Sequence, residues 1–359
     1  MANNLADSLC TSQVSLREDI ERLGELEARL RPKAGFRYIG PSNTQIHSAL
    51  VASAKMASCS LELNDADFQK FFSDNRKAME IQVKATAYTI GLAPIQFRRY
   101  AWVRRQAIAD LTRSALDNLK AGLLLPSLIN VRSALEQIGN AFFIRADVKE
   151  FHDSHYATPT LWSSALVEVL AKLHERAFGT RIDWKTYLES PFSTGKTKSY
   201  QPVAGFMDME ANKLLHGVDA LDKTVRGTRM CYEFLCEFAH PNAGVFFLSL
   251  FCKDVVRRDS PFIFIDTTLA SNFPSYAVGL LAPRIADVFS IYCQAIEELL
   301  VVLGEYDRAA REIEKRAKPV LKTVIGNCSS LWELQEPCPC LSGKPVGSCC
   351  GKAIVRTPH

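Results

Sequence analysis

Four of the eleven cysteines in this 359-residue chain lie within thirteen residues, from Cys338 to Cys350. They form two pairs, Cys338 with Cys340 and Cys349 with Cys350, with eight residues between the pairs. Eight residues are enough to turn the chain and bring the second pair of sulfur atoms to face the first. Four thiolates make a closed tetrahedral set, which suits zinc and leaves no position open for water. The spacing therefore predicts one structural zinc ion bound by Cys338, Cys340, Cys349 and Cys350.

Disulfide bonds or four unrelated thiols are the alternatives to a metal. The first residues, Met1 to Ser8, lack the basic and apolar regions of a secretory signal, which indicates a cytoplasmic protein. In the reducing cytosol, clustered cysteines bind metal more readily than they form disulfides. A closed metal site folds its own loop. Loss of the metal is thus expected to unfold the tail and to leave the melting of the remaining chain nearly unchanged.

The tail also resembles a known zinc-binding motif. Pro337-Cys-Pro-Cys, Ser342-Gly-Lys and Cys349-Cys-Gly-Lys resemble the SEC-C motif. This motif is the tail of the SecA preprotein translocase and also ends many unrelated bacterial proteins. It has Cys-x-Cys, eight residues, and then Cys followed by His or Cys, so the resemblance implies the same four ligands. It covers roughly 17 residues.

The chain departs from this motif at two places. Leu341 stands where the family usually has glycine. Pro345-Val-Gly-Ser stands where the family usually has lysine and aromatic residues. In the translocase that basic surface helps to recognise a partner chaperone and membrane lipids. The resemblance therefore implies the metal site but not those two partners.

Composition alone argues for neither a nucleic-acid-binding nor a membrane protein. Apolar residues make up 47% of the chain and charged residues 23%, with a formal net charge of +4. This mild balance gives no indication of nucleic-acid or membrane binding. The most apolar segment, 277–303, contains Arg284, Asp287, Glu297 and Glu298, so we expect no transmembrane segment.

Apolar periodicity predicts a mainly α fold, a helical bundle with a small β-hairpin and a C-terminal zinc knuckle. The hairpin is expected near 245–268, where two runs rich in β-forming residues follow one another. Helices are expected at about 15–30, 44–62, 66–90, 94–122, 126–150, 159–179, 202–216, 222–240 and 274–303. A continuation of the last helix past Gly304 to about 324 is the alternative.

Punctuation by proline, glycine and polar runs predicts four parts. They are an N-terminal helical region (1–62), a helical domain that includes the hairpin (63–326), a linker (327–337) and the knuckle (338–352).

The helix expected from 94 to 122 carries four arginines beside aromatic residues: Arg98, Arg99, Arg104 and Arg105. Arginine next to aromatic side chains can bind a nucleic-acid backbone and stack on bases. At 100° per residue, however, the four spread around much of the helix, which favours a solvated face with arginine–aromatic pairs. Contact with RNA at these four residues is the alternative.

Two polar pairs elsewhere suggest a second resemblance. Arg132 and Glu136 are one helical turn apart, and Glu237 and His240 end another helix. With the apolar hairpin, they resemble a set of uncharacterised bacterial helical proteins. Those proteins are similar in turn to HEPN domains, many of which are ribonucleases of toxin and phage-defence systems. The resemblance covers roughly residues 85–305 and implies an HEPN-like bundle. A structural polar cluster around His240 is the simpler interpretation.

HEPN ribonucleases use an arginine and a histidine, with four to six residues between them, for phosphate stabilisation and acid–base chemistry. The resemblance implies Arg145 and His152 for these roles, or His240 with an arginine, but such a spacing also arises by chance in a chain of this length. A di-iron site would need a second Glu-x-x-His, which the sequence lacks, and no nucleophile-elbow pattern appears. No catalytic residue is therefore assigned.

Two functions remain as hypotheses. The first is a cytoplasmic zinc-binding interaction protein, whose knuckle contacts protein or nucleic acid and which needs no catalytic activity. The second is an HEPN-type ribonuclease that needs no metal for catalysis. The sequence leaves open whether the chain forms a homo-oligomer.

Overall fold

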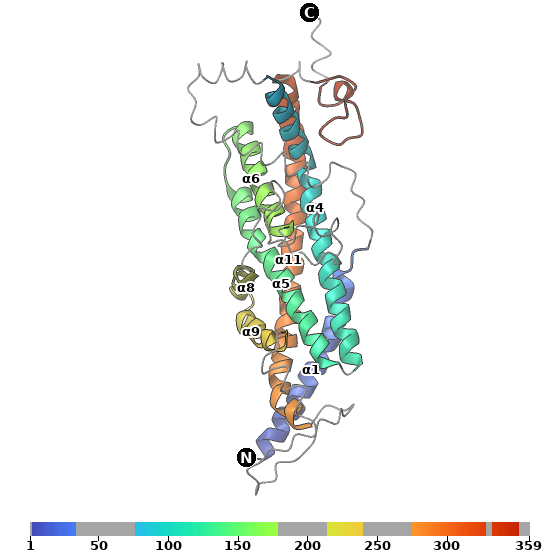
Figure 1. Ribbon diagram of the computed structural model, residues 1–359, viewed down its shortest axis with the longest axis vertical. Coiled ribbons are helices and arrows are strands. Elements are labelled where there is room, and N and C mark those ends of the chain that lie inside the picture. The colour runs from blue at the N-terminus through green and yellow to red at the C-terminus, as the bar shows by residue number, and fades with distance from the viewer. Residues whose placement is uncertain are drawn as a thin grey trace, which may run out of the picture. The chain divides into compact units, whose positions relative to one another are not determined.

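The computed structural model describes residues 2–33, 76–121, 123–178, 214–239, 275–327 and 332–351. Within these ranges the chain forms seven α-helices and no strand, which confirms the predicted mainly α class (Figure 1). The helices are α1 (Ala2–Leu30), α4 (Arg76–Lys120), α5 (Leu124–Asp153), α6 (Pro159–Phe178), α8 (Leu214–Asp222), α9 (Thr228–Ala239) and α11 (Ser275–Asn327). The expected hairpin at 245–268 and the helix at 44–62 lie outside the described residues.

Several helix boundaries differ from expectation. Helix α8 continues to residue 222, where an end at 216 is expected, and α9 begins at 228 and not at 222. The helices expected at 66–90 and 94–122 are one helix from residue 76 onward, α4, which continues through Pro94. Proline removes one backbone hydrogen bond there, and its ring crowds the carbonyl group of the residue four positions earlier. The flanking Leu92, Ala93 and Phe97 are fully or almost fully buried, so packing holds the helix together across the proline. Helix α1 likewise begins at Ala2 and not at residue 15. The extension of the last helix beyond Gly304 is confirmed by α11.

The chain divides into two compact units. Unit 1 comprises Met1–Gly35, Trp102–Phe143 and Lys213–Leu303, and unit 2 comprises Phe36–Ala101, Ile144–Asn212 and Gly304–His359. The helices α4, α5 and α11 each supply residues to both units. The four-part division expected from the sequence stays a prediction.

A buried polar contact joins α4 to α11 in the core of unit 1. Thr112 of α4 donates a hydrogen bond to the carbonyl oxygen of Ile108 at 2.7 Å, and its hydroxyl lies 2.6 Å from that of Tyr292 of α11. Both side chains are fully buried, and burial raises the pKa of Tyr292. The Tyr292 hydroxyl therefore remains protonated and can donate to Thr112, so the two hydroxyls satisfy each other.

Helices α5 and α8 of unit 1 approach each other at two glycines. A β-carbon added at Gly139 would lie 2.7 Å from the carbonyl carbon of Gly217, and one added at Gly217 would lie 2.7 Å from that of Gly139. Such separations are shorter than a β-carbon can tolerate against backbone. The absence of side chains at these two positions is thus what permits the crossing.

Candidate metal centre

The knuckle is built around a tight turn that follows α11. Pro337 and Pro345 form an isolated antiparallel bridge, and the Cys338 amide donates to the Lys344 carbonyl at 3.0 Å. A short 3-10 helix, η3 (Val346–Ser348), leads to the second cysteine pair. The Gly351 amide donates back to the Val346 carbonyl at 2.8 Å. These bonds bring the two ends of the eight-residue spacer together.

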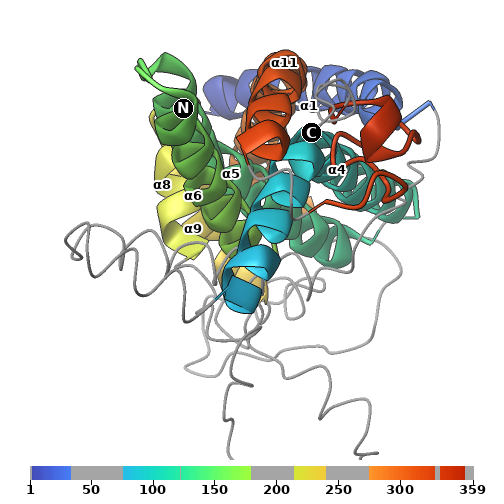
Figure 2. The same ribbon diagram turned by 90° about the horizontal axis from the view of Figure 1, so that it is seen from above.

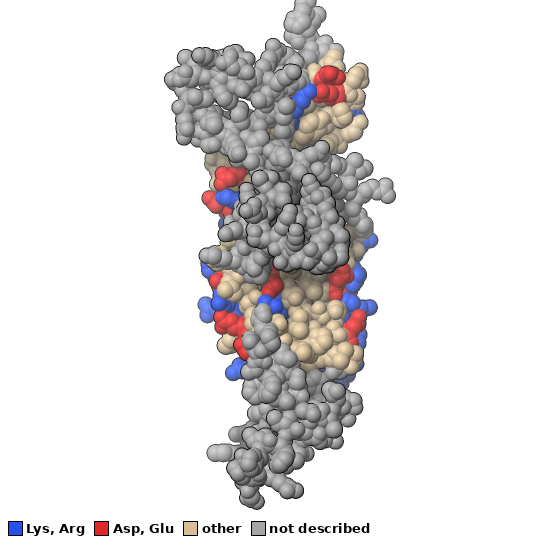
Figure 3. All heavy atoms as spheres, in the orientation of Figure 1, with Lys and Arg blue, Asp and Glu red and all other residues tan. Residues whose placement is uncertain are grey.

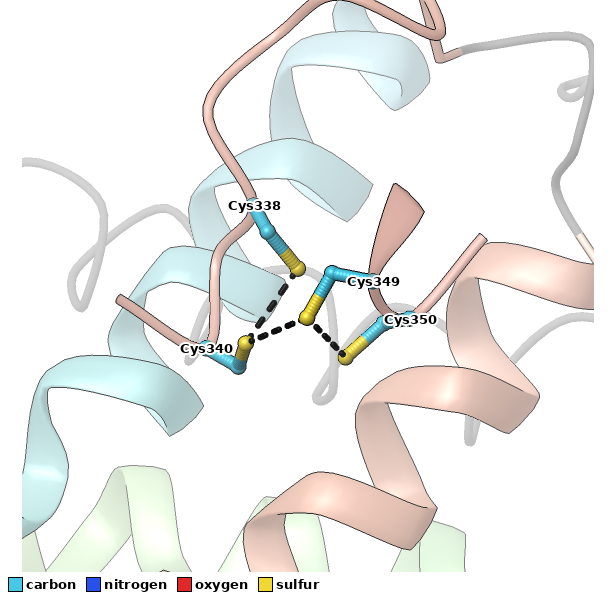
Figure 4. A group of neighbouring side chains, drawn as sticks. All are labelled: Cys338, Cys340, Cys349 and Cys350. Carbon is cyan, nitrogen blue, oxygen red and sulfur yellow. Dashed lines mark hydrogen bonds between the residues drawn. The ribbon is translucent and has the colours of Figure 1, made fainter. Parts of the chain in front are cut away.

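The four sulfur atoms converge as the spacing predicts (Figure 4). All four Sγ atoms lie within 4.8 Å of one another. Cys340 Sγ lies 3.3 Å from Cys338 Sγ and 3.3 Å from Cys349 Sγ, which is 4.0 Å from Cys350 Sγ. Tetrahedral zinc with bonds of about 2.3 Å separates its sulfur ligands by about 3.8 Å. The donor set therefore fits one tetrahedral ion, and no disulfide joins these four cysteines.

Burial and hydrogen bonding shift the pKa values of the knuckle thiols in different directions. Burial raises the pKa of the Cys338 and Cys350 thiols. Burial also opposes ionisation of Cys340, but hydrogen bonds from Ser342 and the neighbouring thiols outweigh it and lower its pKa to about 7. A divalent cation among the sulfurs favours the thiolate form of all four, which is the form that ligates metal. An ion bound by all four cysteines would have no ligand position free, as is typical of structural sites.

The turn between the cysteine pairs contains two residues with left-handed backbone. Leu341 has φ of 56° and Gly343 has φ of 73°. Glycine adopts this conformation freely, whereas an L-residue with a β-carbon resists it. Leu341 is the residue that departs from the resembled motif, which usually has glycine there. The backbone gives a physical reason for that preference.

Substitutions at these two positions are expected to change zinc affinity in opposite directions. Leu341→Gly relieves about 1 kcal/mol of backbone strain, which corresponds to about fivefold tighter zinc binding when folding and binding are coupled. Gly343→Ala adds a similar strain and weakens binding about fivefold. Competition with a chelating dye measures both. Equal affinities in the two variants would contradict this account of the turn.

The knuckle packs against the first half of α4, within unit 2 (Figure 2). Lys84 donates to Glu336 at 2.7 Å and lies 5.6 Å from the ring centre of Trp332. Tyr88 donates its hydroxyl hydrogen to the Pro337 carbonyl at 2.9 Å, and its ring lies 6.2 Å from that of Trp332. Trp332 is only 6% exposed. The segment that leads into the cysteines is therefore packed against α4.

Gly91 of α4 permits the closest part of this contact. A β-carbon there would lie 1.7 Å from the Pro339 carbonyl oxygen. Gly91→Ala is therefore expected to displace the knuckle from α4 while its four cysteines still bind zinc. Limited proteolysis should cut 332–351 faster, with zinc per chain unchanged. Gly326→Ala in the same unit is the control, because a β-carbon there meets nothing within 4 Å. Equal cleavage in both variants would contradict the docking.

Arg145 and His152, the residues implied by the HEPN resemblance, line one pocket of about 290 Å³ in unit 2. Each already has an acidic partner on α11. Arg145 makes two hydrogen bonds of 2.7 Å to Glu305, and His152 Nε2 lies 2.6 Å from Glu312. The pocket therefore contains acid–base pairs and is not uniformly basic.

The four arginines of α4 have different surroundings. Arg104 is 8% exposed and donates to Asn140 at 3.1 Å, so its guanidinium is turned inward. Arg98 pairs with Glu314 of α11. Arg99 and Arg105 are half-buried and also have interaction partners. The described contacts thus tie Arg98 and Arg104 to the protein itself.

Arg132 and Glu136 pair at 3.0 Å, as their spacing predicts. Tyr232 of α9 joins them, since it donates to Glu136 at 2.8 Å and accepts from Arg132 at 3.2 Å. Glu237 is exposed, and His240 lies outside the described residues. This cluster links α5 to α9 within unit 1.

Sequence reasoning missed the residues that anchor the knuckle, above all Trp332, Tyr88 and Lys84. The available signal was a tryptophan in a segment expected to be a linker, because a solvated linker rarely keeps so large an apolar side chain.

The fold and site together define a mainly helical protein with a four-cysteine cluster that can hold a metal ion. Comparison with known protein families, with curated proteins and with solved structures finds no match to this chain. None of the helices in the described ranges is long and apolar enough to cross a membrane.

Proposed function

We propose that this chain is a cytoplasmic zinc-binding interaction protein, whose knuckle resembles the SEC-C motif and contacts another protein. The convergence of four cysteine sulfurs within 4.8 Å carries the proposal. Zinc is the favoured ion, because a closed set of four thiolates suits it better than the other common divalent metals of the cytosol.

The exposed residues of the knuckle favour a protein partner over nucleic acid. The exposed residues of 332–351 include Glu333, Leu334 and Lys344. Within 332–351 the sole aromatic side chain, Trp332, is buried against α4, and Lys344 is the sole basic one. Nucleic-acid sites need several cations and stacking aromatics. Much of the surface of this region in Figure 3 is accordingly uncharged.

The first test is the zinc content of the purified full chain, for which one ion per chain is expected. Cys340→Ser should lose it. The partner is then sought with the full chain as bait. Proteins that crosslink to the unaltered chain are compared with those that crosslink to a Leu334→Glu variant. Leu334 is 42% exposed, so the substitution changes the knuckle surface without affecting a ligand. A partner of the knuckle should be lost in this variant while zinc is retained. Binding of RNA that Lys344→Glu abolishes would replace the protein partner with a nucleic acid.

A ribonuclease is the second candidate, because Arg145 and His152 line the same pocket. An arginine for phosphate and a histidine for acid–base chemistry are the groups that the HEPN resemblance implies. The test is cleavage of total RNA by the intact protein, beside a His152→Ala/His240→Ala double variant. Cleavage lost in the double variant would make the chain a nuclease. Zinc binding without cleavage would favour the interaction protein.

A further inference from the structure

The four cysteines of the knuckle differ in their exposure to solvent. Cys338 and Cys350 are 2% and 3% exposed, respectively. Cys340 and Cys349 are half-buried, and their sulfur atoms lie 3.3 Å apart. The Ser342 hydroxyl, itself on an exposed residue, lies 3.1 Å from Cys349 Sγ. A small solute can therefore reach one neighbouring pair of sulfurs before the other two.

Covalent geometry favours the same pair for disulfide formation. Cys349 and Cys350 are adjacent, so their α-carbons are about 3.8 Å apart, below the range of about 4.4–6.8 Å found for disulfides. Cys338 and Cys350 are shielded from an oxidant by burial. Cys340 and Cys349 come from opposite sides of the turn and face each other (Figure 4). Cys340 and Cys349 are therefore the accessible pair that can form a disulfide with little movement of the backbone.

We propose that Cys340 and Cys349 are a site of reversible oxidation by hydroperoxides, and that oxidation releases the metal. The proposal rests on the zinc site of the proposed function. The Cys340 thiolate attacks one peroxide oxygen, the O–O bond breaks, and the departing hydroxide takes up a proton to form water. Cys340 is then a sulfenic acid.

The Cys349 thiolate next attacks the Cys340 sulfur and displaces a second hydroxide, which also becomes water with a proton. The sum is two thiolates, one hydrogen peroxide and two protons giving one disulfide and two waters. Two electrons pass from the sulfurs to the peroxide. The knuckle then keeps two of its four ligands, Cys338 and Cys350, and no longer holds zinc in a closed site.

The test begins with the zinc-loaded full chain. Zinc per chain is measured first, and its absence at this stage would refute the proposed function. Hydrogen peroxide is then added at one to ten equivalents, with released zinc followed by a chromogenic chelator. Non-reducing peptide mapping identifies the disulfide. One zinc released per Cys340–Cys349 disulfide is expected, with recovery after thiol reductant and added zinc. Retained zinc, or a disulfide between other cysteines, would overturn the inference while leaving the zinc site intact.

Two ligand-preserving variants sharpen the experiment. Cys349→His keeps four zinc ligands but removes the partner of Cys340, so zinc release by peroxide should slow at least about tenfold, the factor that corresponds to about 1.4 kcal/mol in the barrier. Cys350→His also keeps four ligands and retains the accessible pair, so release should resemble that of the unaltered chain. Equal sensitivity of Cys349→His and the unaltered chain would show that another pair reacts.

Discussion

Replacement of Cys340 by serine is expected to loosen helix α4 over residues 84–91 as well as the knuckle itself. The cysteine spacing alone predicts a tail that unfolds independently of the remaining chain. The structure instead packs Trp332 against Tyr88 and pairs Glu336 with Lys84. Without metal the knuckle loses the free energy that folds it, about 10–16 kcal/mol in zinc-finger peptides. Its contacts with α4 should be lost with it.

The expected local loss of stability over residues 84–91 is about 3 kcal/mol, the scale for losing the packing of a buried tryptophan. Hydrogen–deuterium exchange measures it directly. In Cys340→Ser, exchange should rise in peptides that cover 332–351 and in those that cover 84–91. It should remain unchanged over 166–173 of α6, a buried part of the same unit.

Ser348→Ala is the matched control, because Ser348 is an exposed knuckle residue whose hydroxyl donates to the Pro345 carbonyl and is no metal ligand. It should keep zinc and the exchange pattern of the unaltered chain. If Cys340→Ser lost zinc but left 84–91 fully protected, the knuckle would be an independent tail, as the spacing alone suggests.

The four-cysteine cluster and its docking differ in how far the sequence could reveal them. All four cysteines lie within thirteen residues, so a short turn is enough to bring their sulfur atoms together. The docking joins Tyr88 to Pro337, which are 249 positions apart, and depends on which faces of two elements meet. No local pattern specifies such a meeting. The tryptophan at 332 was the one local sign of it.

Helix boundaries likewise depend on both local sequence and non-local packing, and only the first can be predicted from the sequence. Pro94 is typical of a first helical turn, and the sequence accordingly suggests a start there. Its buried neighbours hold α4 together across the proline, a tertiary effect that propensity does not contain. Pro159 starts α6 as expected, because there the rule and the surroundings agree. The pairing of Arg145 with Glu305 is again non-local, so no local pattern could reveal that this arginine has an acidic partner on α11.

Gly139→Ala is expected to destabilise unit 1 by about 2 kcal/mol, although alanine is the better helix former. In an open helix the substitution gains about 1 kcal/mol. At Gly139 the new β-carbon would lie 2.7 Å from the carbonyl carbon of Gly217. Backbone cannot rotate away as a side chain can, so α5 and α8 must separate. Overpacking of this kind costs about 3 kcal/mol, at the upper end of its usual range, and outweighs the gain.

Gly304→Ala separates the two effects. Gly304 lies inside α11, and a β-carbon there meets nothing within 4 Å, so this variant should gain stability of about 0.5–1 kcal/mol. Urea unfolding followed by circular dichroism measures both variants. Gly217→Ala should repeat the loss seen for Gly139→Ala, since each glycine faces the backbone of the other. Stabilisation of all three variants would show that α5 and α8 do not meet at these glycines. Loss of stability in Gly139→Ala and Gly217→Ala, with a gain in Gly304→Ala, would place the crossing of α5 and α8 at Gly139 and Gly217.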